Sequence, residues 1–168
     1  KGNNKYKSSY FQKYKNIWHH GDFAKITNRR GFVIYGRSDT TLNPGGVRLG
    51  TAEIYSVVEK FKEIQESIAI GQSWDNDVRI ILFIVLNKGY KLTDKIKDKI
   101  KKEIKMNASP RHVPSKILQI LEIPKTKNGK LVELAVKQSI EGKKIRNLEA
   151  LANPNSLKQF KNIKELNE

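Results

Sequence analysis

The chain has 168 residues, 38% of them hydrophobic, with no cysteine and a formal net charge of +16. A chain of this length can bury one hydrophobic core, and the lack of cysteine excludes disulfide frameworks, zinc ribbons and thiol nucleophiles. No apolar run approaches the ~20 residues of a membrane-spanning helix, and no secretion signal opens the chain, so we expect a cytoplasmic protein without a membrane partner. The chain begins with Lys1 and not Met, which suggests a fragment of something longer.

The positive charge is distributed unevenly along the chain. Nine basic and two acidic side chains fall in residues 1–40, five and six in 41–90, and nineteen and nine in 91–168. Lysine outnumbers arginine 26 to 7, whereas base reading and bidentate phosphate binding favour arginine. A lysine-rich solvated surface is the simplest interpretation. The alternative is a basic face for a polyanionic ligand, which includes nucleotides and coenzymes as well as nucleic acid.

The first forty residues predict a β-hairpin and a boundary. Residues 1–21 are polar and aromatic without a clear period. Two short apolar runs, Phe23–Ile26 and Phe32–Tyr35, flank a gap that contains Asn and Gly, a pattern typical of a hairpin. Gly36–Asp39 breaks the pattern, so we predict two domains, residues 1–38 and residues 39–168.

Beyond this boundary the apolar residues predict a helix followed by two strands. From Thr51 onward they recur at helical spacing, and Gly50 or Thr51 is the expected N-cap. The runs Ile64–Ile70 and Val78–Leu86 predict strands, the second of which is apolar enough to be central in a sheet.

The last part of the chain predicts a further helix, strand and helix. Thr93 is the expected N-cap of a helix whose isoleucines at 96, 100 and 104 are four residues apart. Lys116–Ile123 predicts a third strand, a basic turn spans 124–130, and a helix follows from Val132 to Ile140. Short capped helices are expected around Pro154. The sequence therefore predicts an α+β fold with a three-stranded sheet flanked by helices.

Generic phosphate and metal motifs are absent. Gly45–Gly50 lacks the G-x-G-x-x-G spacing of a dinucleotide fold, and Gly129-Lys130 lacks the flanking residues of a Walker loop. His19, His20 and Asp22 are metal-binding residue types, but the H-E-x-x-H frame is missing, so we predict no metal site in this chain.

Two segments before the predicted helix at Thr51 carry residue types suited to a nucleotide. Asp22 follows a glycine, and a carboxylate can accept hydrogen bonds from both hydroxyls of a ribose, although a capped turn is the simpler reading. Arg37 and Asp39 add a fixed cation and an anion.

Two further segments complete the set of candidate residues. Gly46 and Arg48 offer a loop without side-chain bulk and a second guanidinium just before the helix. The basic turn at 124–130 ends in Lys130. Each of these segments is a weak signal by itself.

Together, the order and spacing of these segments resemble the C-terminal signature of the adenylate-forming acyl-CoA synthetase family. That signature runs G-D, G-R-x-D, G-x-R before a helix with A-E-I, and late in the chain P-K-T-x-x-G-K. The sequences WHHGDFA at 18–24, LNPGGVRLGTAEIY at 42–55, ASPRHVP at 108–114 and EALANP at 149–154 are similar to the branch that acts on acetoacetate. The resemblance covers nearly the whole chain from about Tyr10.

The resemblance implies the C-terminal part of an acetoacetate–CoA ligase. Such enzymes activate a carboxylate with ATP to an acyl-adenylate and then transfer the acyl group to coenzyme A, with Mg²⁺ expected on the pyrophosphate. The implied partners are acetoacetate, ATP, coenzyme A and the protein's own N-terminal adenylation domain, of which residues 1–38 are a remnant. The isolated chain is expected to be inactive. Within the family, the alternative is a short-chain synthetase of the acetyl or propionyl type.

The resemblance also implies a role for each candidate residue. A cation suits the position of Lys130, because attack of a carboxylate on the α-phosphate brings two anions together. A lysine on a mobile turn can neutralise that charge in one pose and leave in the next. Glu133 stands where many relatives have an arginine. The implied roles are ribose binding for Asp22, contact with the ribose and phosphate for Arg37, the hinge for Asp39, the pantetheine tunnel for Gly46, the ATP phosphates for Arg48, and catalysis of adenylation for Lys130.

A function of another class competes with this one, namely a small basic module that binds nucleic acid. It explains the charge and aromatic residues such as Tyr6 and Tyr10, which could stack on bases. It does not explain Asp22, Asp39 or the spacing of the glycine–arginine pairs, so we predict no nucleic-acid partner. A non-catalytic regulatory domain of the same fold is disfavoured because Lys130 is present.

Overall fold

The structure of the chain is a computed structural model that describes residues 2–145 and 147–168. Lys1, where the first predicted domain begins, lies outside the described residues. Short 3₁₀ helices lie at Pro44–Gly46, Pro110–His112, Leu148–Ala150, Pro154–Phe160 and Lys164–Asn167. The other elements, in chain order, are α1 (Gly2–Tyr10), β1 (Asp22–Ile26), β2 (Phe32–Arg37), α2 (Ala52–Val58), β3 (Ile64–Trp74), β4 (Asp77–Leu86), α3 (Asp94–Asn107), β5 (Lys116–Gln119) and α4 (Glu133–Ile140).

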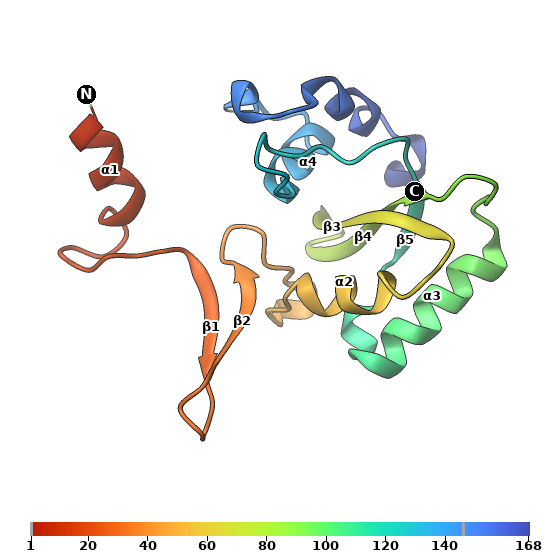
Figure 1. Cartoon of the computed structure of the whole chain (residues 1–168), viewed down its shortest axis with the longest axis horizontal. Helices are drawn as coiled ribbons and strands as arrows, with labels where there is room; N and C mark the ends of the chain where they lie inside the picture. The colour runs from red at the N-terminus through yellow and green to blue at the C-terminus, as the bar shows by residue number, and fades with distance from the viewer. Residues whose placement is uncertain (1, 146) are drawn as a thin grey trace.

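The predicted hairpin is present and forms a sheet of its own. β1 and β2 pair antiparallel, and Figure 1 shows them to one side of the larger sheet and its helices. The Thr27 backbone N–H donates to the Gly31 carbonyl at 2.8 Å and closes the turn. Ile26, Phe32 and Ile34 are between 60% and 71% exposed, which is unusual for apolar side chains of a two-stranded sheet in a folded chain.

The helix α1 was not predicted from the sequence. Its residues lack a helical apolar period because the apolar contacts come from aromatic rings. The ring centroids of Tyr6 and Phe11 are 5.8 Å apart, and those of Tyr10 and Trp18 are 5.4 Å apart in a stacked arrangement. Contacts between rings that stand apart in the sequence leave no periodic signature.

The three-stranded sheet has the order β3-β4-β5, with β3 antiparallel and β5 parallel to the central β4. The predicted strands are confirmed, but their lengths differ. β3 continues to Trp74 because a tight turn at Asp75 and Asn76, both at positive φ, keeps it paired with β4 to its end. β5 stops at Gln119, four residues earlier than expected, because pairing with β4 is limited to 116–119.

The central strand is buried on both faces, which explains its unbroken apolar run. Ile80, Leu82 and Ile84 contribute to a core cluster with α2 and α3, while Ile81 and Phe83 contribute to a second cluster with α4 and the C-terminal segment. In Figure 1, α2 and α3 accordingly cover one face of the sheet, and α4 with the C-terminal segment covers the other. This is the α+β fold that the sequence predicted.

The N-caps predicted for α2 and α3 agree with the structure. Thr93 is the N-cap of α3, and its hydroxyl accepts a hydrogen bond from the Ile96 backbone N–H. Thr51 is the N-cap of α2 by position, without a capping side-chain hydrogen bond. The short helices predicted for the C-terminal segment are present as 3₁₀ helices, but without capping side-chain hydrogen bonds. Asn153 does not cap one of them, because its amide Oδ1 accepts from the Lys125 backbone N–H at 2.9 Å and its Nδ2 donates to the Ile123 carbonyl at 3.0 Å.

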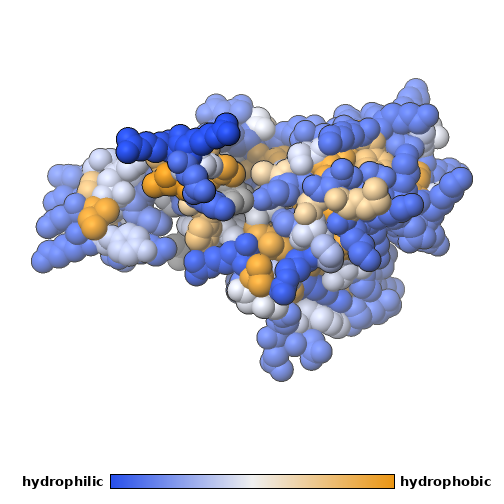
Figure 2. Space-filling view, turned by 90° about the horizontal axis from the view of Figure 1, so that it is seen from below, coloured by the Kyte–Doolittle hydropathy of each residue, from blue (hydrophilic) through white to orange (hydrophobic). Residues whose placement is uncertain are grey.

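Hydrophilic side chains predominate on the face shown in Figure 2, and the hydrophobic ones form small patches between them. This agrees with a lysine-rich solvated surface. In the part of the chain that the structure describes, no helix combines the length and the apolar character needed to cross a membrane.

The buried His112 should make the stability of the folded chain depend on pH. Its Nδ1 lies 2.8 Å from the Ser109 hydroxyl, and its buried Nε2 has no hydrogen-bond partner among the described residues. Burial lowers the pKa of His112 below its usual value of 6.5, and the negative charge of Glu53 only partly opposes this. The unfolded chain therefore binds this proton at a higher pH than the folded chain does.

We accordingly expect the free energy of unfolding to fall as the pH is lowered through 6.5 and further toward the lower pKa of His112 in the folded chain. The His112→Gln variant, which cannot titrate, should show a shallower dependence over the same range. Urea unfolding at several pH values measures both slopes. Equal slopes in the two proteins would mean that His112 has no such role.

Candidate active-site cleft

The hairpin register brings Asp22 and Arg37 together. The two residues are direct partners across β1 and β2, and Arg37 Nη1 lies 3.5 Å from Asp22 Oδ1 and donates to the His20 carbonyl at 2.8 Å. A Cβ at Gly21 would lie 3.0 Å from Arg37 Nη2, and Gly21 has φ +89°, so glycine is required at this position. The His20 imidazole contacts the other oxygen of the Asp22 carboxylate.

Arg37 also contacts Asp39. Arg37 Nε lies 3.4 Å from Asp39 Oδ1, so one guanidinium lies between two carboxylates. The side chains of Arg37 and Asp39 are 51% and 48% exposed. Ion pairs at such exposed positions contribute little stability, and a bound ligand can replace them at small cost.

Lys130 ends a turn that is fixed at its base. Lys125 and Leu131 form a β-bridge, the Thr126 backbone N–H donates to the Lys130 carbonyl at 2.9 Å, and the Thr126 hydroxyl accepts from the Lys130 backbone N–H at 3.1 Å. Gly129 has φ +74°, which the turn requires. The Lys130 side chain is exposed. The turn therefore holds the backbone of Lys130 while its ammonium group is free to reach a ligand.

Arg37, Asp39 and Lys130 line one cleft. The cleft has a volume of about 810 Å³, and Thr126, Glu133 and residues 143–145 also contribute to its walls. This volume lies in the range of small-molecule sites. Residues 91 positions apart in the sequence thus face a common space, which Arg37 and Lys130 line with positive charge and Asp39 with negative charge. Such a site suits an anionic ligand that also carries hydroxyl groups.

Gly46 and Arg48 lie on a separate loop. The Gly45 backbone N–H donates to both oxygens of the Asp77 carboxylate, at 2.9 and 3.0 Å, which fixes the loop to β4. Gly46 has φ +75°, and no atom lies within 4 Å of the place where its Cβ would be. The Arg48 guanidinium lies 4.9 Å from the centre of the Phe23 ring, next to Asp22 in β1. Neither Gly46 nor Arg48 contributes to the walls of the cleft.

Two further cations of the cleft were not predicted from the sequence. Lys143 and Lys144 contribute to its wall, and Lys143 Nζ lies 2.7 Å from Glu141 Oε2. Two consecutive lysines directly after Gly142, at the end of α4, were the available signal.

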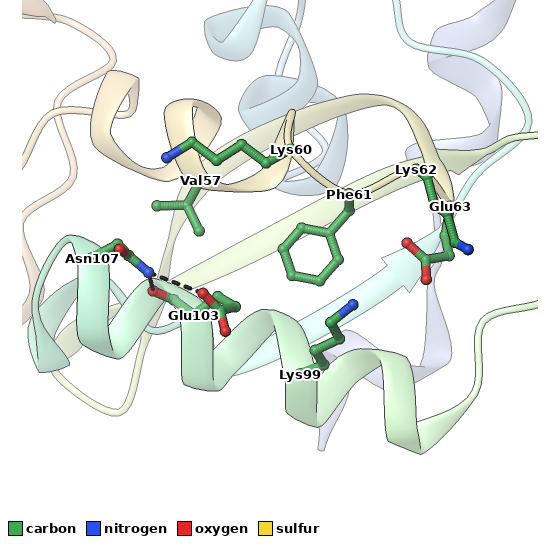
Figure 3. A pocket seen from close by; sticks show the side chains of 8 residues that line it. All are labelled: Val57, Lys60, Phe61, Lys62, Glu63, Lys99, Glu103 and Asn107. Carbon is green, nitrogen blue, oxygen red and sulfur yellow. Dashed lines mark hydrogen bonds between the residues drawn. The ribbon is translucent and has the colours of Figure 1, made fainter.

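A second cleft, of about 360 Å³, lies between the C-terminal end of α2 and α3 (Figure 3). Its walls carry both lysine and glutamate side chains, and Lys99 Nζ lies 5.1 Å from the centre of the Phe61 ring. None of the six candidate residues contributes to it. We therefore place the candidate site at the larger cleft.

Mg²⁺ is the one metal that the family resemblance implies. In residues 2–145 and 147–168, no group of three or more His, Cys, Asp or Glu side chains is arranged to hold a metal ion. The donor set of the described residues therefore does not fit a dedicated cation site.

Comparison with known proteins identifies the fold. Residues 53–130, which run from α2 to Lys130, match the family described as AMP-binding enzyme C-terminal domain. The chain carries an AMP-binding enzyme C-terminal domain. The structure superposes on acetoacetyl-CoA synthetase from Streptomyces lividans with a TM-score of 0.87 and 36% sequence identity, covering 99% of this chain and 25% of that one.

Sequence relatives of this AMP-binding enzyme C-terminal domain agree with the structural comparison. Acetoacetyl-coenzyme A synthetase of Rhizobium meliloti is 52% identical over 162 residues, and acetoacetyl-CoA synthetase of Rattus norvegicus is 43% identical over 164 residues. Both comparisons cover 96% of this chain. The chain spans about a quarter of the length of these relatives. The family resemblance in the sequence is thereby confirmed, whereas the roles of the six site residues stay predictions.

Proposed function

We propose that this chain is the C-terminal part of an ATP-dependent acetoacetate–CoA ligase, which converts acetoacetate, ATP and coenzyme A into acetoacetyl-CoA, AMP and pyrophosphate through an acyl-adenylate. The observation that carries the proposal is the 52% identity to an acetoacetyl-coenzyme A synthetase along 96% of the chain. The cleft that Arg37, Asp39 and Lys130 share supports it, because its charges suit a nucleotide and an activated carboxylate.

In this proposal, residues 1–38 belong to the large adenylation domain and residues 39–168 form a mobile domain with its hinge at Asp39. The separate sheet of β1 and β2 supports the division, as do its exposed apolar side chains, which suit a surface that the rest of the large domain covers. Residues 38–40 form a turn between the two parts.

Adenylation is the first half-reaction. A carboxylate oxygen of acetoacetate attacks the α-phosphorus of ATP, a new O–P bond forms, and pyrophosphate leaves with the electron pair of the broken P–O bond. Asp22 accepts hydrogen bonds from the ribose hydroxyls, and Arg37 contacts the ribose and the phosphate. Lys130 neutralises the negative charge that gathers between the carboxylate and the α-phosphate. Arg48 faces the ATP phosphates.

Thioester formation is the second half-reaction. Rotation about Asp39 carries Lys130 away and brings the loop with Gly46 to the reaction centre. The absence of a side chain on Gly46, and the open space beside it, suit a narrow passage for the pantetheine chain. The thiol sulfur attacks the acyl carbon, AMP leaves with its phosphate oxygen, and the thiol proton is released.

The acyl preference is tested with the intact enzyme by ATP–pyrophosphate exchange with acetoacetate, acetate and propionate. We expect acetoacetate to give the largest kcat/KM, by at least about tenfold, because a site that hydrogen-bonds a keto oxygen discriminates against acids without one. A preference for acetate or propionate would overturn the acetoacetate assignment in favour of a short-chain synthetase.

These 168 residues alone should catalyse neither half-reaction. Positioning of the reactants supplies most of the rate in phosphoryl chemistry, and this chain contributes only one side of the proposed site. The measurement is ATP–pyrophosphate exchange with the purified chain, and the intact enzyme is the positive control. Exchange by the chain alone would contradict the proposal that it is one part of a two-part active site.

A further inference from the structure

The hydroxyl of Tyr55 connects the helices that follow the two loops used in the proposed function. Tyr55 lies on α2, which follows the loop of Gly46 and Arg48. Glu133 is the first residue of α4 and stands three positions after Lys130. The Tyr55 Oη donates a hydrogen bond to Glu133 Oε1 at 3.1 Å, across 78 positions of sequence.

The surroundings fix the direction of this hydrogen bond. The backbone N–H of Ala69, in the edge strand β3, donates to Tyr55 Oη at 3.1 Å. An amide N–H can only donate, so the phenol oxygen accepts here and its own hydrogen is left for Glu133. Burial, and then the negative charge of Glu133, raise the pKa of Tyr55 far above its ordinary value. The phenol therefore stays a donor at every pH at which the protein functions.

The position of Glu133 gives this hydrogen bond a function. Glu133 lines the cleft together with Lys130 and Asp39, and also a small crevice beside Asp39 and Thr40. The turn before it is exposed at 127–130, with its hydrogen bonds at the base. The contact with Tyr55 is thus a point at which the segment carrying Lys130 is attached to the sheet and to α2.

We propose that Tyr55 and Glu133 are positioning residues that set the place of Lys130 in the cleft. This rests on the proposed function, because it assigns Lys130 the adenylation step. A hydrogen bond with a charged acceptor is among the stronger ones, and small displacements of a catalytic group are costly in rate.

The test compares matched variants of the intact enzyme. Tyr55→Phe and Glu133→Ala should each lower the kcat of adenylation about tenfold, with KM values for ATP and acetoacetate nearly unchanged. Glu133→Gln keeps a carbonyl oxygen that accepts from the phenol, so it should stay within about threefold of the parent enzyme. The double variant Tyr55→Phe/Glu133→Ala should be no slower than either single variant. Thioester formation from supplied acyl-adenylate should be unaffected in all four.

A second measurement does not depend on activity. Hydrogen exchange of the backbone amides at 126–130 should become faster in Tyr55→Phe and Glu133→Ala and stay unchanged in Glu133→Gln. Unchanged exchange in the first two variants, or a rate loss in Glu133→Gln equal to that in Glu133→Ala, would overturn the positioning role. If Lys130→Ala leaves adenylation at full rate, the proposed function fails instead, and hydrogen exchange still reports whether the pair holds the turn.

Discussion

In the intact enzyme, Lys130→Ala slows adenylation by about 10²–10³ and leaves thioester formation from supplied acyl-adenylate nearly unchanged. One preorganised electrostatic contact with the transition state is worth an effect of this size. In the proposed mechanism the second step is spared, because rotation about Asp39 would remove the Lys130 turn from the reaction centre. The two steps are timed separately, by ATP–pyrophosphate exchange and by acetoacetyl-CoA formation from the adenylate.

Lys127→Ala is the matched control for this experiment. Lys127 is an exposed lysine on the same turn, three positions before Lys130, and it does not line the cleft as described. Its replacement removes the same net charge and should leave both steps within about twofold of the parent enzyme. If Lys130→Ala slowed both half-reactions equally, Lys130 would serve nucleotide affinity or structure and the role assigned to it would be wrong.

Gly46→Trp has the opposite effect, because it spares adenylation and slows thioester formation by about 10² or more. No atom lies within 4 Å of the place where a Cβ at Gly46 would be, so an added side chain meets no neighbour at its first atom. In the second pose the indole would fill the proposed path of the pantetheine chain. A misplacement of about 1 Å between reacting groups already costs a factor of this order.

The Gly46→Ala variant distinguishes the effect of side-chain bulk from the effect of backbone strain. Gly46 has φ +75°, so any side chain at this position is strained to a similar extent. The alanine variant carries this strain without the indole, and it should retain most of the activity in both steps. If the alanine and tryptophan variants were equally impaired in thioester formation, the effect would come from the backbone and the tunnel assignment would be lost.

Much of the fold follows from the sequence because β4 determines the rest. An apolar run from Ile80 to Val85 without a polar interruption requires cover on both faces, which α2 and α3 supply on one face and α4 with the C-terminal segment on the other. The helix α1 could not be predicted in this way. Its aromatic contacts join residues on and after the helix, and no periodic pattern encodes such contacts.

The candidate site was predictable only in part. Placing the turn between the two apolar runs predicts the pairing of Asp22 only to within one residue, because a register shift between Phe23 and Ala24 moves its partner from Gly36 to Arg37. The approach of Lys130 to Arg37 does not follow from spacing, because it depends on how α4 packs on the sheet. Tyr55 and Glu133 belong to no sequence motif that predicts their contact, and only the tertiary structure brings them together.

The place of Arg37 between Asp22 and Asp39 has a thermodynamic consequence. In the proposed enzyme, one guanidinium serves both the carboxylate that holds the ribose and the carboxylate at the pivot. A nucleotide that draws Arg37 toward its phosphate weakens the contact with Asp39 and so changes the balance between the two poses. Linkage requires the reverse effect to be of equal size, so the pose in which Asp39 retains Arg37 binds the nucleotide more weakly by the same factor. The same coupling free energy then determines both the preference between the two poses and the ease with which AMP is released.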